Sequence, residues 1–197
     1  MNLTPRFEEA LRYAVIIHAG QMRKGTSVPY VSHLLGVASL VLEFGGNEAE
    51  AIGALLHDAG EDAGGAGRIE DIRLRFGEAV AAIVAGCTDT IVSPKPPWRV
   101  RKEAYLAHLP PAPASVRLVS AADKLHNARA ILRELRRDGD TRWAKFSGGR
   151  AGTLWYYRAL VGAYQSAGSG ELIEELDRTV TAIERLCPGA APAPRAH

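Results

Sequence analysis

The sequence predicts an all-α fold, a single helical bundle. Apolar residues recur at intervals of three and four along most of its 197 residues, which is the spacing of one face of a helix. No segment sustains the alternation of apolar and polar residues that is typical of a β-strand. The length allows one full core, so we expect one domain over residues 1–187 and a disordered tail over 188–197.

The first three helices are marked by residues that favour helix ends. Thr4 can cap the first helix, and the glycine-bounded loop 20–28 follows it. A second helix ends at the glycine pair 45–46, because glycine readily adopts the backbone conformation found after a helix C-terminus. Asn47 is placed to cap a third helix, which runs to about residue 58.

Glycine and proline clusters divide the rest of the chain. We expect the glycine-rich segment 64–67 to be a loop, and the proline-rich segments 94–97 and 110–113 to interrupt the helical pattern. No internal repeat is visible. Around these breaks the apolar spacing predicts helices near 69–76, 79–87, 98–108, 116–137, 152–167 and 171–186.

Composition and charge exclude several classes of function. The formal net charge is +2, so the chain lacks the strong positive field that favours nucleic acid. Its two cysteines, Cys87 and Cys187, argue against a disulfide framework and a thiolate zinc site. The N-terminus lacks a signal-peptide pattern, and no apolar run reaches membrane-spanning length. We therefore expect a cytoplasmic protein with no nucleic-acid or membrane partner.

The most informative motif is the run from His57-Asp58 to Glu61-Asp62. The adjacent histidine and aspartate offer an imidazole nitrogen and a carboxylate at a helix end, which suits Mn²⁺, Fe²⁺ or Zn²⁺. The second acidic pair follows one helical turn later and is expected on the same face. Two ligands with two spare carboxylates indicate a metal-dependent hydrolase that activates water. The alternative for Glu61-Asp62 is a solvated helix end.

Two further residues complete a ligand set that comes from three predicted helices. The four candidates for metal ligands are His33, His57, Asp58 and Asp123. Helical bundles commonly build a metal site from facing helices in this way. Each residue alone has a simpler interpretation, because a lone histidine is more often a surface or core-edge residue and Asp123 can pair with Lys124. Taken together, the four favour a metal site.

These motifs resemble those of a known family over about residues 8–130. The matching segments are 18–24 (HAGQMRK), 29–33 (PYVSH), 54–62 (ALLHDAGED), 76–77 with Val84 and 88–89, and 122–127 (ADKLHN). The His-Asp pair resembles that of the HD-domain metal phosphohydrolases. The Arg-Lys loop, the Pro-Tyr-x-x-His segment and the Glu-Asp pair narrow the resemblance to the RelA/SpoT-type alarmone hydrolases, in their small stand-alone form.

The resemblance implies an HD-type helical bundle with a mononuclear metal site. It implies that the four histidine and aspartate candidates hold one divalent ion, usually Mn²⁺, with Fe²⁺, Co²⁺ or Zn²⁺ as alternatives. It also implies that Glu61 and Asp62 orient or deprotonate the attacking water and later pass on its proton.

A set of substrate contacts follows from the same resemblance. Arg23 and Lys24 match the family's substrate-binding loop, where two adjacent cations could bind phosphates, although by charge alone a solvated surface loop would be the simpler interpretation. Asn127 matches an asparagine that contacts the nucleoside, and Lys124 is either a phosphate contact or a partner of the neighbouring aspartate. Arg150 lies outside the matching segments, but its position favours the start of a helix, from which it could reach a distal phosphate.

The implied activity is hydrolysis of the 3′-pyrophosphate of an alarmone of the stringent response. The substrate would be (p)ppGpp or its adenine analogue (p)ppApp, giving GDP or GTP, or ADP or ATP, plus pyrophosphate. Alternatives are another HD phosphohydrolase activity, such as a nucleotidase or an NADPH 2′-phosphatase, and a non-catalytic nucleotide-binding sensor. Ser120 stands where many alarmone hydrolases have lysine, so the choice between guanine and adenine is left open. Whether the chain forms a homodimer is also left open.

Overall fold

The computed structural model describes residues 2–62, 64–90, 92 and 94–188, without the side chain of Asp62. Within these ranges the chain is helical and contains no β-strand, which confirms the all-α prediction. The residues group into two compact units: the first holds those up to Pro96 together with Ala112–His126, the second holds Pro97–Pro111 and those from Asn127 onward. None of the described helices has the length and apolar character needed to cross a lipid bilayer.

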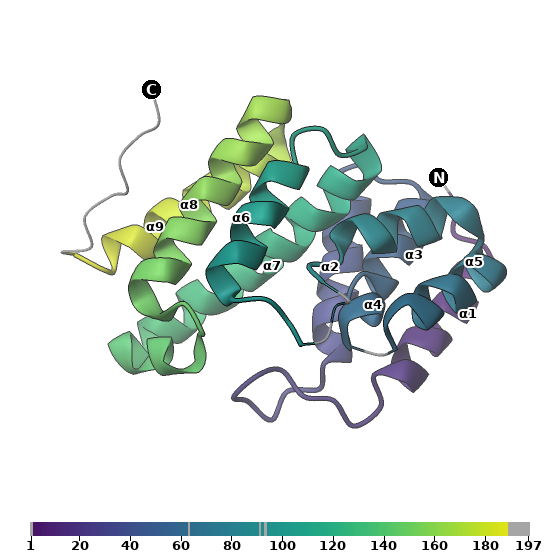
Figure 1. Cartoon of the computed structure of the whole chain (residues 1–197), viewed down its shortest axis with the longest axis horizontal. Helices are drawn as coiled ribbons and strands as arrows, with labels where there is room; N and C mark the ends of the chain where they lie inside the picture. Colours follow the sequence, from purple (N-terminus) through teal and green to yellow (C-terminus); the bar gives the residue numbers. More distant parts are fainter. Residues whose placement is uncertain (1, 63, 91, 93, 189–197) are drawn as a thin grey trace. The chain divides into compact units, whose positions relative to one another are not determined.

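The first unit holds the helices that carry the ligand candidates (Figure 1). They are α1 (Pro5–Ile17), α2 (Val31–Glu43), α3 (Glu48–Leu56), the single-turn α4 (Ala59–Asp62), α5 (Gly65–Cys87) and the N-terminal half of α7 (Ala114–Asp138). Helix α3 packs against α1, α2 and α5, and its residues from Ala51 to Leu56 are all buried. A helix that is apolar on every side must be enclosed by its neighbours, so α3 forms the centre of this core.

A capping box defines the start of α3. The Asn47 side-chain oxygen accepts a hydrogen bond from the Glu50 backbone N–H at 3.1 Å, and the Asn47 backbone N–H donates to the Glu50 carboxylate at 2.7 Å. The other oxygen of Glu50 accepts a hydrogen bond from the Ser115 hydroxyl of α7 at 2.6 Å. The predicted cap is confirmed, and the same carboxylate also ties α3 to α7.

Glycines allow α5 to approach two neighbouring helices closely. A Cβ atom on Gly53 of α3 would lie 2.7 Å from Cγ2 of Ile83 in α5. A Cβ atom on Gly86 of α5 would lie 2.7 Å from Cγ2 of Val116 in α7. Both distances are far shorter than a van der Waals contact between carbon atoms. An alanine at either glycine would therefore push the helices apart.

The prediction of a loop at 64–67 is wrong for most of this segment, because α5 begins at Gly65. Helix α5 contacts α4, although its first turn contains glycines of low helix propensity. The two helical stretches predicted at 69–76 and 79–87 are both helical, and a kink within α5 separates them. Gly77 has φ +81° and ψ 169°, which a residue without Cβ adopts at little cost and which interrupts the helix.

The second unit is built around α8 (Gly149–Ala167). Its other elements are α6 (Trp98–His108), the C-terminal half of α7, the 3₁₀ helix η1 (Gly139–Lys145) and α9 (Glu171–Arg185). Helix α8 contacts α6, η1 and α9, and Figure 1 shows α8 and α9 side by side. The sequence pattern does not predict η1, because a 3₁₀ helix has three residues per turn rather than the 3.6 of an α-helix.

Two boundaries differ slightly from their predictions. Helices α7 and α8 begin at Ala114 and Gly149, a little before the predicted residues 116 and 152. Apolar periodicity does not define a helix end, where capping and local contacts decide. The predicted tail lies outside the described residues except for Pro188, so a single domain that ends at residue 187 stays a prediction.

Replacing Asn47 with alanine is expected to lower the free energy of unfolding. The variant loses the side-chain acceptor for the Glu50 N–H, which costs about 1 kcal/mol at a typical helix N-terminus. The measurement is urea denaturation followed by circular dichroism. Asn47→Asp keeps an acceptor and is the matched control, which should stay close to wild type. An equal decrease in the free energy of unfolding in both variants would contradict the role of Asn47 as a cap.

Candidate metal centre

The four side chains predicted as metal ligands meet inside the first unit. His33 lies on α2, His57 and Asp58 follow the end of α3, and Asp123 lies on α7. Nε2 of His33 is 3.2 Å from Oδ1 of Asp123 and 3.5 Å from Oδ2 of Asp58. Nε2 of His57 is 3.0 Å from Oδ2 of Asp58 and 3.7 Å from Oδ1 of Asp123. The structure thus brings together two imidazole nitrogens and two carboxylate oxygens from three helices.

The end of α3 orients the ring of His57. Its Nδ1 lies 2.8 Å from the backbone oxygen of Ala54, one turn earlier in the helix. A carbonyl oxygen only accepts hydrogen bonds, so Nδ1 must carry a proton and donate it. The neutral ring therefore presents the lone pair of Nε2 toward the carboxylates, as a metal-ligating histidine requires. Sequence reasoning identified His57 but not this backbone contact.

Burial and opposite charge compete at these groups. Burial opposes the charged form of His57, but the carboxylates of Asp58 and Asp123 outweigh it and raise its pKa to about 10. Burial likewise works to raise the pKa of both carboxyl groups. The charge of His57 at Asp58, the charge of Lys124 at Asp123, and hydrogen bonds from the imidazoles hold these two pKa values well below the usual range. The cluster therefore favours a positive charge between its carboxylates.

A divalent cation fits this donor set. One ligand atom each from His33, His57 and Asp58 lies within 4.8 Å of the others. Nε2 of His57 is buried beside carboxylate oxygens of Asp58 and Asp123, at 3.0 and 3.7 Å, so in the neutral ring its lone pair has no hydrogen-bond donor among the described residues. Imidazole nitrogens and carboxylate oxygens are ligands for first-row divalent metals. The His/Asp group of this chain can accordingly bind a divalent metal ion.

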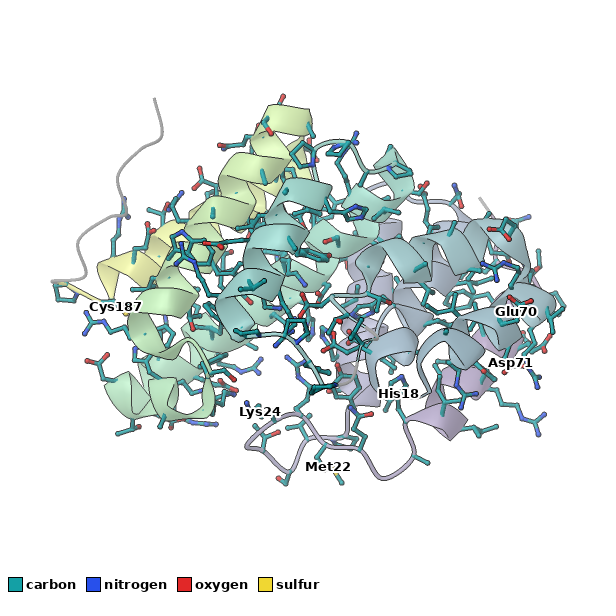
Figure 2. All side chains as sticks on the ribbon, in the orientation of Figure 1. His18, Met22, Lys24, Glu70, Asp71 and Cys187 are labelled. Atoms are coloured by element: carbon teal, nitrogen blue, oxygen red, sulfur yellow. The ribbon has the colours of Figure 1, made fainter. Side chains whose placement is uncertain are left out.

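The loop between α1 and α2 is linked to the predicted metal ligands through Tyr30. The Tyr30 hydroxyl donates a hydrogen bond to Oδ2 of Asp58 at 2.5 Å. The ring of Tyr30 stacks on that of His18 at 5.2 Å, and the guanidinium of Arg23 lies 5.9 Å from its centre. Figure 2 labels His18 at the end of α1 and Lys24 on this loop. Tyr30 was recognised as part of the Pro-Tyr-x-x-His segment but no role was predicted for it, although its place one turn before His33 was a usable signal.

The acidic pair occupies a separate short helix, α4, rather than a continuation of α3. Oε1 of Glu61 forms an ion pair with Nζ of Lys95 at 2.7 Å, and the Glu61 side chain is one quarter exposed. The side chain of Asp62 lies outside the described residues. The roles predicted for this pair in water activation stay predictions.

The predicted substrate contacts are distributed over both units. Nζ of Lys124 lies 2.6 Å from Oδ2 of Asp123, which agrees with its alternative interpretation as a partner of this aspartate. Asn127 and Arg150 belong to the second unit, and Arg150 lies in the first turn of α8 as predicted. The Arg150 guanidinium forms an ion pair with Asp140 at 3.2 Å. Contacts of these residues with a substrate stay predictions.

The chain is similar to known proteins over most of its length. Residues 10–154 match the model of the HD domain family. The guanosine-3′,5′-bis(diphosphate) 3′-pyrophosphohydrolase MESH1 of Xenopus tropicalis is 38% identical over 128 residues, which cover 64% of this chain and 69% of that protein. The protein of the same name from Homo sapiens is 33% identical over 128 residues, with the same two coverages.

A solved structure leads to the same family. It is described as a metazoan ortholog of SpoT that hydrolyzes ppGpp and plays a role in starvation responses. Its TM-score against this chain is 0.76 at 26% sequence identity, over 96% of this chain and 99% of that chain. From these matches, the chain belongs to the HD-domain family and, within it, to the group that contains the small RelA/SpoT-type alarmone hydrolases.

Proposed function

We propose that this chain hydrolyses the 3′-pyrophosphate of ppGpp and pppGpp, giving GDP or GTP and pyrophosphate. The observation that carries the proposal is the meeting of His33, His57, Asp58 and Asp123 in a chain whose relatives are named as hydrolases of this nucleotide. The bond to be broken joins the 3′ oxygen to phosphorus. The reaction adds water to that phosphorus and leaves a protonated 3′ hydroxyl on the nucleoside.

We assign the four side chains to one divalent ion, with Mn²⁺ as the first choice. A bound ion of this kind lowers the pKa of water and polarises a phosphate oxygen. The Ala54 carbonyl keeps the His57 ring oriented, and Tyr30 occupies one lone pair of the Asp58 carboxylate. Lys124 neutralises part of the charge of Asp123 and limits the repulsion between the two carboxylates.

Proton transfer is assigned to the acidic pair of α4. Glu61 or Asp62 takes a proton from the attacking water and returns it to the leaving 3′ oxygen. The ion pair with Lys95 restrains the Glu61 carboxylate, because it joins α4 to the segment that precedes α6.

Substrate binding is assigned to the cationic loop and to three residues further along the chain. Arg23 and Lys24 contact phosphate oxygens, since a guanidinium and an ammonium both favour such anions. Asn127 contacts the nucleoside, and Lys124 and Arg150 add cationic contacts to the phosphates. A cytoplasmic location is part of the same proposal.

The deciding experiment is a Mn²⁺-dependent hydrolysis assay with ppGpp and ppApp in parallel, with products separated by ion-exchange chromatography. Release of pyrophosphate and GDP from ppGpp supports the proposal, and release of ADP from ppApp would extend it to adenine. No turnover of either nucleotide by a protein that binds Mn²⁺ would overturn it. A nucleotidase or NADPH 2′-phosphatase would then be sought, and binding of ppGpp without turnover would indicate a sensor.

Asp58→Asn is expected to abolish Mn²⁺ binding and hydrolysis together. The substitution removes one of two anionic ligands while preserving the size of the side chain. Metal content after gel filtration is measured by elemental analysis, and turnover by release of pyrophosphate. Asp177→Asn is the matched control, because Asp177 forms its ion pair with Arg158 in the second unit. Retained metal in Asp58→Asn would contradict the ligand assignment.

Glu61→Gln is expected to keep Mn²⁺ but to lower kcat by about 10²–10⁴, the usual effect of losing a general acid or base. Single-turnover kinetics, with enzyme in saturating excess over substrate, measure the chemical step directly. Glu78→Gln provides a control, because Glu78 forms an exposed ion pair with Arg73. A kcat like that of wild type would remove Glu61 from the mechanism.

A further inference from the structure

The ring of His33 makes a second contact on the side that faces away from the carboxylates. Its Nδ1 lies 2.8 Å from Nδ1 of His126, and the two ring centres are 4.8 Å apart. His126 lies on α7, three residues after Asp123, so the same stretch of helix supplies a metal ligand and the partner of another. His33 itself is only 1% exposed.

The two imidazoles of the centre are therefore held by different kinds of group. His57 donates its Nδ1–H to a backbone carbonyl, which no substitution removes. For Nε2 of His33 to offer its lone pair, Nδ1 must carry the proton, and Nδ1 of His126 must accept the hydrogen bond. Here the orienting group is a side chain, and its effect can be tested by substitution.

The helix that carries His33 leaves room for this partner. A Cβ atom on Gly36 would lie 2.3 Å from Nε2 and 2.4 Å from Cδ2 of His126. Any residue other than glycine would displace the ring from its place beside His33. Glycine inside a helix lowers its stability relative to alanine. At this position of α2, however, glycine leaves the space that the ring of His126 occupies.

We propose that His126 is a positioning residue for the metal centre: it accepts a hydrogen bond from Nδ1–H of His33 and so fixes the tautomer and the orientation of that ligand. Gly36 serves the same function by admitting the ring. The inference rests on the proposed metal site and adds a residue that acts through His33. Partners of ligating histidines typically contribute about 10- to 100-fold to metal affinity.

The test compares His126→Asn with His126→Gln by isothermal titration with Mn²⁺. The side-chain oxygen of asparagine is separated from Cα by the same number of bonds as Nδ1 of histidine, so it can accept the bond from His33. Glutamine is closer to histidine in size but places its polar atoms one bond further out. We expect the Kd for Mn²⁺ to rise about 10- to 100-fold in His126→Gln and far less in His126→Asn.

A double-mutant cycle with Gly36 provides the second measurement. Gly36→Ala alone should weaken Mn²⁺ binding as His126→Ala does, because the new methyl group displaces the ring. In a His126→Ala background the same change should have no further effect on Kd, since the clash has gone. It should also raise the unfolding temperature of that background, because alanine favours a helix. Such non-additivity identifies the pair as one unit.

The outcomes separate this inference from the proposed function. Equal Kd values in His126→Gln, His126→Asn and wild type, with wild-type protein that binds Mn²⁺ and hydrolyses ppGpp, overturn the positioning role alone. Equal weakening in His126→Asn and His126→Gln also overturns it, because packing rather than a hydrogen bond would be responsible. A wild-type protein that binds no Mn²⁺ overturns the metal centre and this inference together.

Discussion

The structure depends on one electrostatic constraint, which is that two carboxylates and two imidazoles share a small and largely buried space. Asp58 and Asp123 stay ionised there because positive charge lies next to each of them. When no cation is bound, the raised pKa of His57 favours such a charge on its ring, and Lys124 supplies another at 2.6 Å from Asp123. A divalent cation bound between the carboxylates would satisfy the same requirement. Removing it would leave buried carboxylates that need another positive charge nearby.

The apolar core positions these groups, because the helices that carry them pack against one another. Helix α3 is buried along its length and delivers His57 and Asp58 at its C-terminal end, while a capping box fixes its start. Glycines at 53 and 86 let α5 lie close to α3 and α7, and Gly36 lets α7 reach α2 through His126. Small residues thus set the distances between the helices, and the ligand geometry follows from those distances.

The sequence predicted four side chains that the structure brings together, but it described their surroundings less completely. His33, His57, Asp58 and Asp123 could be recognised because metal chemistry requires those side-chain types and helix spacing orders them. The hydrogen bond from Tyr30 to Asp58 and the ion pair between Glu61 and Lys95 were not predicted. Each joins residues far apart in the chain, and nothing in local periodicity specifies which distant groups will meet.

The sequence by itself determined the all-α class, the cap at Asn47, an interruption between residues 76 and 79, and the choice of four candidates for metal ligands. These features depend on propensities and side-chain chemistry that act within a few residues. The tertiary structure alone decided that residues 65–67 join α5, that Lys124 pairs with Asp123, and that His126 supports His33. These outcomes depend on which surfaces pack together, because burial and close contact outweigh local preference.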